Sequence, residues 1–211
     1  MKGRFLAAFF VPFCVLGVIG QCLWLTACNG SKEQVPYEAA QREWREGDLV
    51  LRCGYGLESR AVTQRSSSTY SHIGILHFDS LSGEWQVVHA VPAEDEPEYV
   101  KAEPVRIFFS PERACKGAWL RIRCSDEQAR AATAYALRKA AEQVLFDNDY
   151  SLEDSTRLYC TELVWRAYGT QGIDVSGGAR QDVPTFLSKD GEGIFPNHIE
   201  KSESTLFIKP F

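Results

Sequence analysis

The chain has 211 residues and a formal net charge of −5 at pH 7, with 45% hydrophobic and 24% charged residues. This length and this composition are typical of one globular domain with a real hydrophobic core. No basic stripe stands out against the negative net charge, so we expect no electrostatic binding of nucleic acid.

The N-terminal segment has the pattern of a bacterial export signal. Lys2 and Arg4 precede a run without charges from Phe5 to Gly20, and Leu25-Thr26-Ala27-Cys28 follows. That tetrad resembles the bacterial lipobox, which implies cleavage before Cys28 and attachment of lipid to this cysteine. Several acyl chains would hold the protein on a membrane surface more firmly than one chain does.

The chain is therefore predicted to have three parts: residues 1–27 as a lipoprotein signal peptide, 28–43 as the lipidated cysteine with a polar tether, and 44–211 as the globular domain. The alternative for the first part is an uncleaved signal anchor, because its apolar stretch is long enough to span a bilayer. Asn29 follows the lipid cysteine, which by resemblance to enterobacterial sorting rules favours the outer membrane. In both cases the domain is expected in the cell envelope, attached to a membrane.

Four cysteines remain in the predicted domain: Cys53, Cys115, Cys124 and Cys160. An exported location permits a disulfide, and Cys115 with Cys124 is one possible pair. No Cys-x-x-Cys and no His-x-x-x-His spacing occurs, so we expect no structural zinc site. The sequence implies no cofactor.

The first predicted elements are strands. Gly47–Cys53 has an apolar centre, and a glycine-containing polar loop is expected to follow it as far as Tyr70. His72–Asp79 and Glu84–Val91 then read as a hairpin around the turn Ser80–Gly83.

The hairpin places two histidines close together. If the four-residue turn pairs the two strand ends, Gly74 lies opposite His89, and His72 is a diagonal neighbour of His89 on the same face, roughly 5.5–8 Å away. Gly74 leaves room for the ring of His89. His77 has the other parity and faces away, and His198 lies in a loop-like tail where we expect it to be solvated.

The elements between the hairpin and the C-terminus are predicted in chain order as a loop, two strands, a helix, a connection, a second helix and a last strand. They comprise an acidic, proline-bounded loop at Glu94–Glu103, strands at Val105–Phe109 and Ala118–Arg123, a helix opened by the capping box Ser125–Gln128 and running to about Val144, a connection at Phe146–Asp154, a helix that begins near Tyr159, and a strand at Leu206–Ile208.

The second helix carries a thiol near its start. An apolar stripe with helical spacing runs from Cys160 to Tyr168, with Ser155 or Thr156 as candidate N-caps. The partial positive charge of a helix N-terminus favours thiolate over thiol, which suits a nucleophile. The alternative is that Cys160 is a small buried hydrophobic residue.

A thiol at a helix start and two histidines on an adjacent sheet face form a set for nucleophilic catalysis. Cys160 would attack an amide or ester carbonyl, His72 would accept its proton, and His89 would orient His72 as the third member of a triad. Backbone N–H groups around the cysteine would supply part of an oxyanion hole. The alternative is structural: His72 bonded to backbone and His89 half-buried in the sheet.

Four blocks of the sequence resemble, in the same order, the circularly permuted papain-like hydrolases of the NlpC superfamily, with the YiiX-like branch closest and lecithin–retinol acyltransferase in the same permuted group. The blocks are Gly47-Asp48-Leu49-Val50, Ser71-His72-Ile73-Gly74-Ile75, Val88-His89-Ala90-Val91 and Tyr159-Cys160-Thr161-Glu162-Leu163-Val164. The resemblance implies an α+β fold of the permuted papain-like type, with an antiparallel, partly closed sheet and helices packed on one side.

The same resemblance assigns roles: Cys160 as nucleophile, His72 as base and His89 as third polar residue, with the histidines ahead of the cysteine because of the permutation. Many YiiX-like proteins place Glu at the third position, whereas His89 is closer to the acyltransferase pattern. Glu162 recurs in the family motif, and its place on the cysteine's own helix fits a capping or bracing role.

The first function hypothesis is an exported, lipid-anchored cysteine hydrolase of amide bonds, with cell-wall peptides as substrates. The second is a lipase or acyltransferase that acts on acyl lipids, and the third is a non-catalytic lipoprotein that binds an envelope ligand. The partners expected from the first two are a peptide or lipid substrate with an amide or ester bond, and the membrane. Oligomeric state is not predicted.

Overall fold

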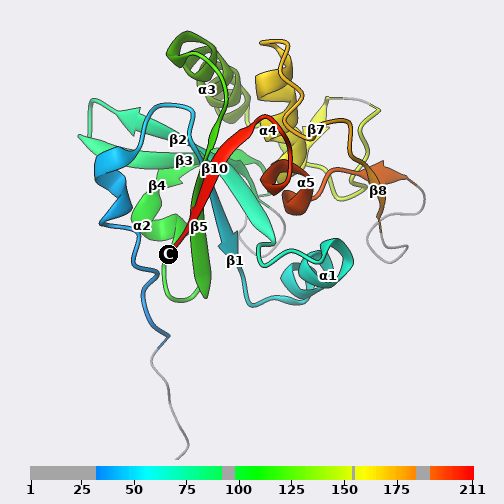
Figure 1. The fold of residues 1–211 in the computed structure, drawn as a ribbon, viewed down its shortest axis with the longest axis horizontal. Helices are drawn as coiled ribbons and strands as arrows, with labels where there is room; N and C mark the ends of the chain where they lie inside the picture. Colours follow the sequence, from blue (N-terminus) through cyan, green and yellow to red (C-terminus); the bar gives the residue numbers. More distant parts are fainter. Residues whose placement is uncertain (1–31, 92–97, 154, 184–190) are drawn as a thin grey trace, which may run out of the picture. The chain divides into compact units, whose positions relative to one another are not determined.

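A six-stranded antiparallel sheet forms the centre of the unit Lys32–Phe211 (Figure 1). The computed structural model describes residues 32–91, 98–153, 155–183 and 191–211. The strand order is β10-β5-β1-β2-β3-β4. The strands are β1 Leu49–Cys53, β2 His72–Asp79, β3 Glu84–Ala90, β4 Val100–Pro104, β5 Lys116–Ile122 and β10 Thr205–Pro210.

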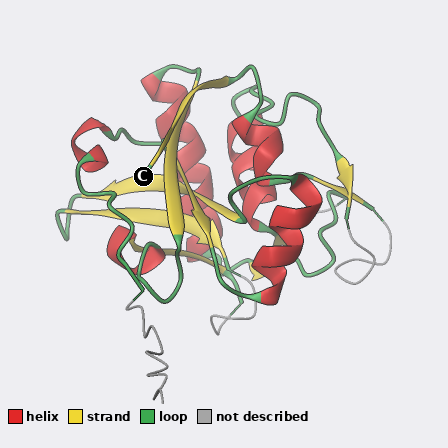
Figure 2. Cartoon of the chain, turned by 60° about the horizontal axis from the view of Figure 1, so that its bottom comes forward, coloured by secondary structure: helices red, strands yellow, loops and turns green. Residues whose placement is uncertain are grey.

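The two faces of this sheet carry different cores, because alternate residues of a strand point to opposite sides. Leu49, Leu51 and Ile75 belong to the core that α3 (Asp126–Ala141) and α4 (Cys160–Gly169) cover. In Figure 2 the strands form one twisted sheet with the longer helices packed beside it. The predicted α+β class with an antiparallel sheet is thus confirmed.

The opposite face is covered by shorter pieces. Residues that share this second core come from α2 (Val105–Phe108), from the segment around the 3₁₀ helix η1 (Ala40–Glu43), and from the alternate positions of the strands: Val35, Tyr37, Trp44, Val50, Leu76, Val87, Val105, Phe108, Phe109, Ala114 and Trp119. Val35 and Tyr37 are buried here, so the packed part of the chain begins before the boundary predicted at residue 44. The predicted signal peptide and Cys28 lie outside the described residues.

The hairpin has the predicted register. Asp79 pairs with Glu84 and Ile75 with Val88, which continues to Gly74 opposite His89. A Cβ atom on Gly74 would lie 3.0 Å from the Cβ of His89 and 2.3 Å from a methyl group of Val87. Only glycine therefore fits without a shift of β3.

The two main helices begin where local hydrogen bonds satisfy their first N–H groups. Before α3, Ser125 Oγ accepts from the N–H of Gln128 at 3.2 Å, and Gln128 Oε1 accepts from the N–H of Ser125 at 3.1 Å, as the capping box predicts. Before α4, the N-cap is Tyr159 and not the predicted Ser155 or Thr156.

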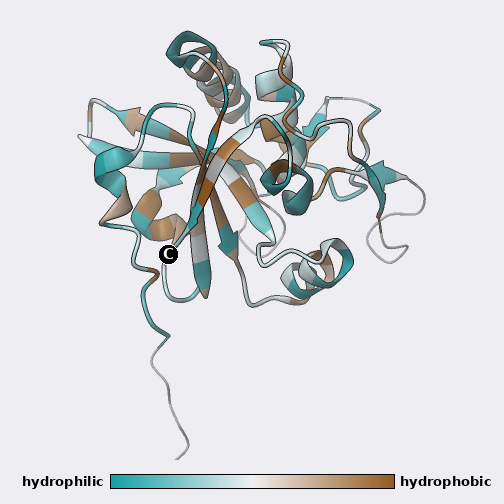
Figure 3. Cartoon of the chain, in the orientation of Figure 1, coloured by the Kyte–Doolittle hydropathy of each residue, from teal (hydrophilic) through white to brown (hydrophobic). Residues whose placement is uncertain are grey.

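Helix α1 (Leu57–Ser66) occupies the predicted polar loop after β1. Its buried residues are Val62 and Ser66, so it lacks the apolar stripe that would reveal a helix in the sequence. Figure 3 shows α1 mostly in teal and white, in contrast to the brown segments of the central strands.

The segment after β3 also differs from the prediction. Val100–Pro104 is strand β4, which lies mostly in the predicted acidic loop, and Val105–Phe108 is the helical turn α2 instead of a strand. Val105 and Phe108 are both buried, and a helical turn brings residues i and i+3 to one side. Pro104 stands at the change of direction.

The remaining elements are short. They are β6 Leu145–Phe146 paired in parallel with β7 Arg157–Leu158, β8 Gln181–Asp182 paired with β9 Glu192–Gly193, and α5 Pro196–Glu200. The predicted last strand is present as β10. No helix among the described residues is both long and apolar enough to cross a bilayer.

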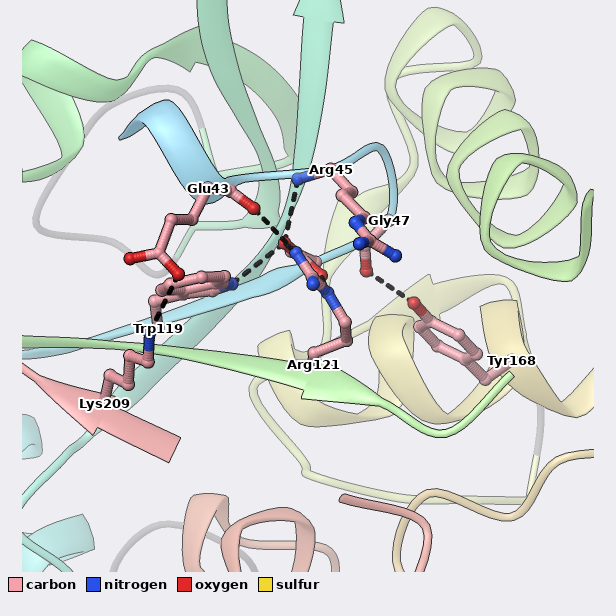
Figure 4. A network of polar contacts seen from close by, with 8 residues as sticks. Glu43, Arg45, Gly47, Trp119, Arg121, Tyr168 and Lys209 are labelled. Carbon is pink, nitrogen blue, oxygen red and sulfur yellow. Dashed lines mark hydrogen bonds and ion pairs between the residues drawn. The ribbon is translucent and has the colours of Figure 1, made fainter. Parts of the chain in front are cut away.

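A buried carboxylate, Asp48, lies directly before β1 and accepts hydrogen bonds from neighbours that Figure 4 labels. It accepts from Trp119 Nε1 at 2.9 Å, from Arg121 Nε at 2.7 Å and Nη2 at 2.6 Å, and from the backbone N–H of Arg45 at 2.9 Å. Tyr168 near the end of α4 donates its hydroxyl to the carbonyl of Gly47. The Gly47-Asp48 block thereby fixes the C-terminal end of α4 against the sheet.

Candidate active site

A cavity of about 320 Å³ opens at the N-terminal end of α4. Its walls come from the first turn of α4, the start of β2, the end of β1 with α1, and residues 193–196. Cys160 and His72 both line it. The two residues that the sequence predicts as nucleophile and base therefore share one cavity, although α1 and the segment 193–196 were not expected in its walls.

Cys160 is the first residue of α4, and its side chain is nearly buried, with 9% of the residue exposed. The backbone N–H of Ile73, the residue next to His72, is among the groups that lower the pKa of the Cys160 thiol against the effect of burial. Thr161 Oγ1 donates to the carbonyl of Ile194 at 2.6 Å, and the hydroxyl of Tyr159 accepts from the N–H of Ile194 at 2.9 Å. These two bonds hold the first turn of α4 against the segment 193–196.

Glu162 stabilises the same helix start. Its Oε2 accepts from the backbone N–H of Tyr159 at 3.4 Å, and its Oε1 accepts from Arg166 Nε at 2.7 Å. Glu162 is fully buried and is absent from the cavity wall. The bracing role expected from its position is what the structure shows.

His72 and His89 are bonded to each other. His72 Nε2 lies 2.8 Å from His89 Nδ1, and the ring centroids are 5.0 Å apart. The diagonal arrangement predicted from the hairpin is confirmed. Because Nε2 of His72 is occupied by this bond, Nδ1 is the ring nitrogen left for another partner.

The relation of the histidines to α4 differs from the expectation of an adjacent face. His72 and His89 share parity with Leu76 and Val87, and both rings pack on Phe108, on the face opposite α4. The cavity that Cys160 shares with His72 lies at an end of the sheet and not across its face. This is possible because His72 is the first residue of β2 and Cys160 the first residue of α4.

Glu103 on β4 extends the pair of histidines, and the sequence reading missed it. His89 Nε2 lies 3.1 Å from Glu103 Oε1, a short electrostatic contact whose N–H direction is off the line of a hydrogen bond. Lys101 Nζ lies 3.2 Å and Arg113 Nη1 3.0 Å from Glu103 Oε2. The alternation of Val100 and Ala102 with charged neighbours was the signal for an edge strand, but the flanking acidic and proline residues favoured a loop.

The two histidines are held neutral. Burial, reinforced by the charge of Arg52, lowers the pKa of His72 well below its ordinary value. Burial also lowers the pKa of His89 to about 4, although the contact with Glu103 opposes the shift. At neutral pH each ring therefore carries one proton and one lone pair.

The thiol is also neutral in the resting structure. Burial, with a contribution from the Glu58 carboxylate, raises the pKa of Cys160 to about 12. The N–H groups around the helix start oppose this shift but do not overcome it. The thiolate expected from the helix N-terminus is thus not the resting form, because desolvation outweighs the field of the helix end.

The other two histidines, which were not predicted as site residues, lie away from the cavity. His77 faces the opposite side of β2 and pairs with Glu46, with Nδ1 2.7 Å from Oε1. His198 lies in α5, half-buried, where Nδ1 accepts from the N–H of Phe195 at 3.1 Å, so it is not the solvated residue that was expected.

Cys115 and Cys124, the pair considered for a disulfide, are both free thiols, as are Cys53 and Cys160. The sulfur of Cys115 lies instead 3.3 Å from the carbonyl oxygen of Cys53. Within the described part of the chain, no group of three or more His, Cys, Asp or Glu side chains is placed to hold a metal ion.

Comparisons with known proteins show the family and the fold. A family model described as a permuted papain-like amidase enzyme, YaeF/YiiX, C92 family, matches residues 43–206. Among solved structures, the YiiX protein of Escherichia coli O157:H7, described as a metalloprotein, aligns with a TM-score of 0.61 at 20% identity, over 79% of this chain and 96% of the other. No curated protein shows significant sequence similarity. Since the family match spans most of the chain, the protein belongs to the YaeF/YiiX family of permuted papain-like amidases.

Proposed function

We propose that this protein is an exported, lipid-anchored cysteine amidase, which hydrolyses amide bonds through a thioacyl-enzyme on Cys160. The observation that carries the proposal is the cavity lined by both Cys160 and His72, with the far nitrogen of His72 bonded to His89 at 2.8 Å. The amidase character of the family supports the reaction class.

In the first half of the reaction, the sulfur of Cys160 attacks the amide carbonyl as its proton passes to Nδ1 of His72. Backbone N–H groups of the first turn of α4 stabilise the oxyanion, because they have no partner within the helix. The C–N bond then breaks, the amine leaves with the proton from His72, and a thioester remains on Cys160.

In the second half, His72 removes a proton from water, which attacks the thioester carbonyl. The C–S bond breaks, the carboxylic acid is released, and the proton returns to the thiol. Because the raised pKa of Cys160 and the lowered pKa of His72 keep both groups neutral at rest, proton transfer accompanies attack and does not precede it as a stable ion pair.

The lining of the cavity supports a charged peptide substrate. Arg52 and Arg113 lie on the wall together with Glu58 and Glu112, so groups of both signs border the thiol. Peptides of the bacterial cell wall carry carboxylates and amines close to their amide bonds. The predicted export of the domain would bring it to such peptides.

One observation favours acyl lipids as a second candidate. Part of the cavity wall is apolar, formed by Val62, Phe146, Ile194 and Phe195. An acyl chain would bury its surface there. With the predicted membrane anchor, this would suit a lipase or acyltransferase with the same nucleophile.

The test is to incubate the full chain separately with muropeptides and with phospholipid vesicles, and to measure released amines and fatty acids. We expect amines from muropeptides, with a loss of at least about a thousandfold in Cys160→Ala. Cys124→Ala is the matched control, because Cys124 lies outside the cavity wall and should retain full activity. Fatty acid release alone would select the lipid candidate, and product formation that persists in Cys160→Ala would refute the nucleophile.

The anchor is tested separately. In cells fed a labelled fatty acid, the intact protein should incorporate label and sediment with the membranes. Cys28→Ala should abolish the label. If the Cys28→Ala protein still incorporated the labelled fatty acid, the lipidation proposal would be wrong, whereas the amidase proposal would be unaffected.

A further inference from the structure

We propose that Glu103 is a positioning residue that fixes the proton order of the two histidines, so that His72 presents a bare Nδ1 to the thiol. The inference rests on the roles proposed above for Cys160 and His72. It adds a fourth residue, one strand further from the cavity.

Three of the four groups form a series of contacts through the protein interior, and the first of them, His72, lines the cavity with Cys160. His72 Nε2 lies 2.8 Å from His89 Nδ1, and His89 Nε2 lies 3.1 Å from Glu103 Oε1. His72 and Glu103 are each 7% exposed and His89 is fully buried. In such surroundings water does not substitute for a misplaced proton, so the orientation of each N–H matters.

The proton order follows from what each group is able to do. An ionised carboxylate only accepts hydrogen bonds, so the proton of neutral His89 belongs on Nε2, toward Glu103. His89 Nδ1 is then an acceptor, and the proton of His72 must lie on Nε2 to fill the 2.8 Å contact. Nδ1 of His72 is left with a lone pair, as a general base requires.

The reverse order is unfavourable for a physical reason. It would place the lone pair of His89 Nε2 against the carboxylate at 3.1 Å. It would also put the proton of His72 on Nδ1, where it could not accept one from Cys160. Without a charge at position 103, little in the surroundings would separate the two orders in energy.

Glu103 is held in its charged form. Burial alone would raise its pKa, but the contact with His89 and the charges of Lys101 and Arg113 outweigh burial and lower it well below the ordinary value. When His72 takes a proton during attack, the same carboxylate also stabilises the positive charge through His89. In the resting structure the Nε2–H of His89 does not point straight at the Glu103 carboxylate. Catalytic hydrogen bonds of this kind become shorter and straighter once charge develops.

His77 with Glu46 supplies an internal control. This is a second contact between a histidine and a carboxylate, at 2.7 Å, on the other face of β2 and outside the cavity. Glu46→Gln removes the same charge from the same kind of contact. An effect seen in Glu103→Gln but not in Glu46→Gln is therefore due to the place of Glu103 beside His89, and not to the loss of a histidine–carboxylate contact in general.

The experiment is nitrogen NMR on the full chain with labelled histidine, in detergent micelles at pH 7, because imidazole nitrogen shifts separate protonated from bare nitrogens. The wild-type spectrum needs no substitution: we expect His72 and His89 both protonated on Nε2. Finding the proton of His72 on Nδ1 would overturn the proposal.

Substitution then tests the cause. In Glu103→Gln we expect a mixture of the two tautomers at His72 and His89. We expect kcat to fall by about tenfold with KM little changed, because part of the molecules keeps the active order while the carboxylate charge is lost. Glu103→Asp should retain the wild-type order and recover part of the rate. Glu46→Gln should change only the His77 signals. Unchanged tautomers in a folded Glu103→Gln protein would overturn the proposal.

The outcome is separable from that of the proposed function. If Cys160→Ala keeps full activity, the nucleophile is wrong, yet the tautomers in the wild-type spectrum still decide the role of Glu103. If Cys160 is essential but the tautomers are insensitive to residue 103, only the further inference fails.

Discussion

Two buried carboxylates on the same sheet, Asp48 and Glu103, have opposite roles. Asp48 accepts from an indole, a guanidinium and a backbone N–H, none of which changes its protonation near neutral pH (Figure 4). Glu103 contacts an imidazole, which titrates and which bonds a second imidazole on the cavity wall. Burial and charge are similar, but the chemistry of the partners differs.

The sequence blocks that resemble the family contain structural residues as well as predicted catalytic residues. Gly47-Asp48 stands in a block beside those of the predicted catalytic residues, yet it serves the fold by anchoring the end of α4 through Tyr168. Glu103 lies in no such block and approaches the site through a pairing of strands. A residue that belongs to a family motif can therefore stabilise the fold or take part in the reaction.

The largest effect is expected from His72→Ala. Loss of the base should reduce amide hydrolysis by about 10³–10⁴-fold, because the thiol would have no acceptor for its proton. The free energy of unfolding should change little by comparison. Amine release and chemical denaturation of the same preparation measure both quantities. Equal losses of activity and folding would instead assign His72 a structural role.

Asp48→Ala should reverse this pattern. It leaves Arg121, which is mostly buried, without the partner at 2.6 Å, and should lower the free energy of unfolding by about 3 kcal/mol. The kcat of the protein that remains folded should stay within about twofold of wild type. Denaturant titration measures the stability, and active-site titration gives kcat per folded molecule. A large fall in kcat per folded molecule would contradict the purely structural role of Asp48.

Acid should destabilise the protein before its carboxylates titrate. The pKa of His89 is about 4 in the folded state against an ordinary value of 6.5, so the unfolded chain binds the proton first. Stability is complete above about pH 6.5 and falls as the pH drops toward 4, by up to about 3 kcal/mol. Urea titrations across this range measure the slope. His89→Gln should reduce the slope by the share of His89 and leave the share of His72, whose pKa is also lowered. An unchanged slope in that variant would contradict the assignment.

A smaller loss of activity than in His72→Ala is expected from His89→Gln. An amide group keeps a polar partner for His72 Nε2 but cannot share positive charge, so amide hydrolysis should fall by about tenfold to a hundredfold, less than in His72→Ala. Rates measured side by side at neutral pH decide the order. A loss equal to that of His72→Ala would make His89 as important as the base itself.

Local patterns predicted the parts of the site that depend on neighbours in sequence. The turn Ser80–Gly83 set the register of the hairpin, and the register brought His72 and His89 together. The capping box at Ser125 gave the start of α3 for the same reason. In each case a few adjacent residues determine the geometry.

Other parts depend on tertiary structure that no local pattern contains. Strand β4 exists because β3 offers an edge to Val100–Pro104, so Glu103 could not be placed before that pairing was known. Likewise the helix start predicted a thiolate at Cys160, whereas burial raises its pKa. Desolvation comes from residues far along the chain, including those of α1 and 193–196.

The most direct test of the central claim uses dibromoacetone, which alkylates a thiol and then an adjacent nucleophile. Peptide mapping by mass spectrometry of the treated wild-type chain should find Cys160 bridged to His72, with the new bond on Nδ1, because Nε2 is bonded to His89. The control His72→Ala should retain only single alkylation of Cys160. A bridge from Cys160 to another residue, or no bridge in the wild type, would contradict the pairing of this thiol with this imidazole.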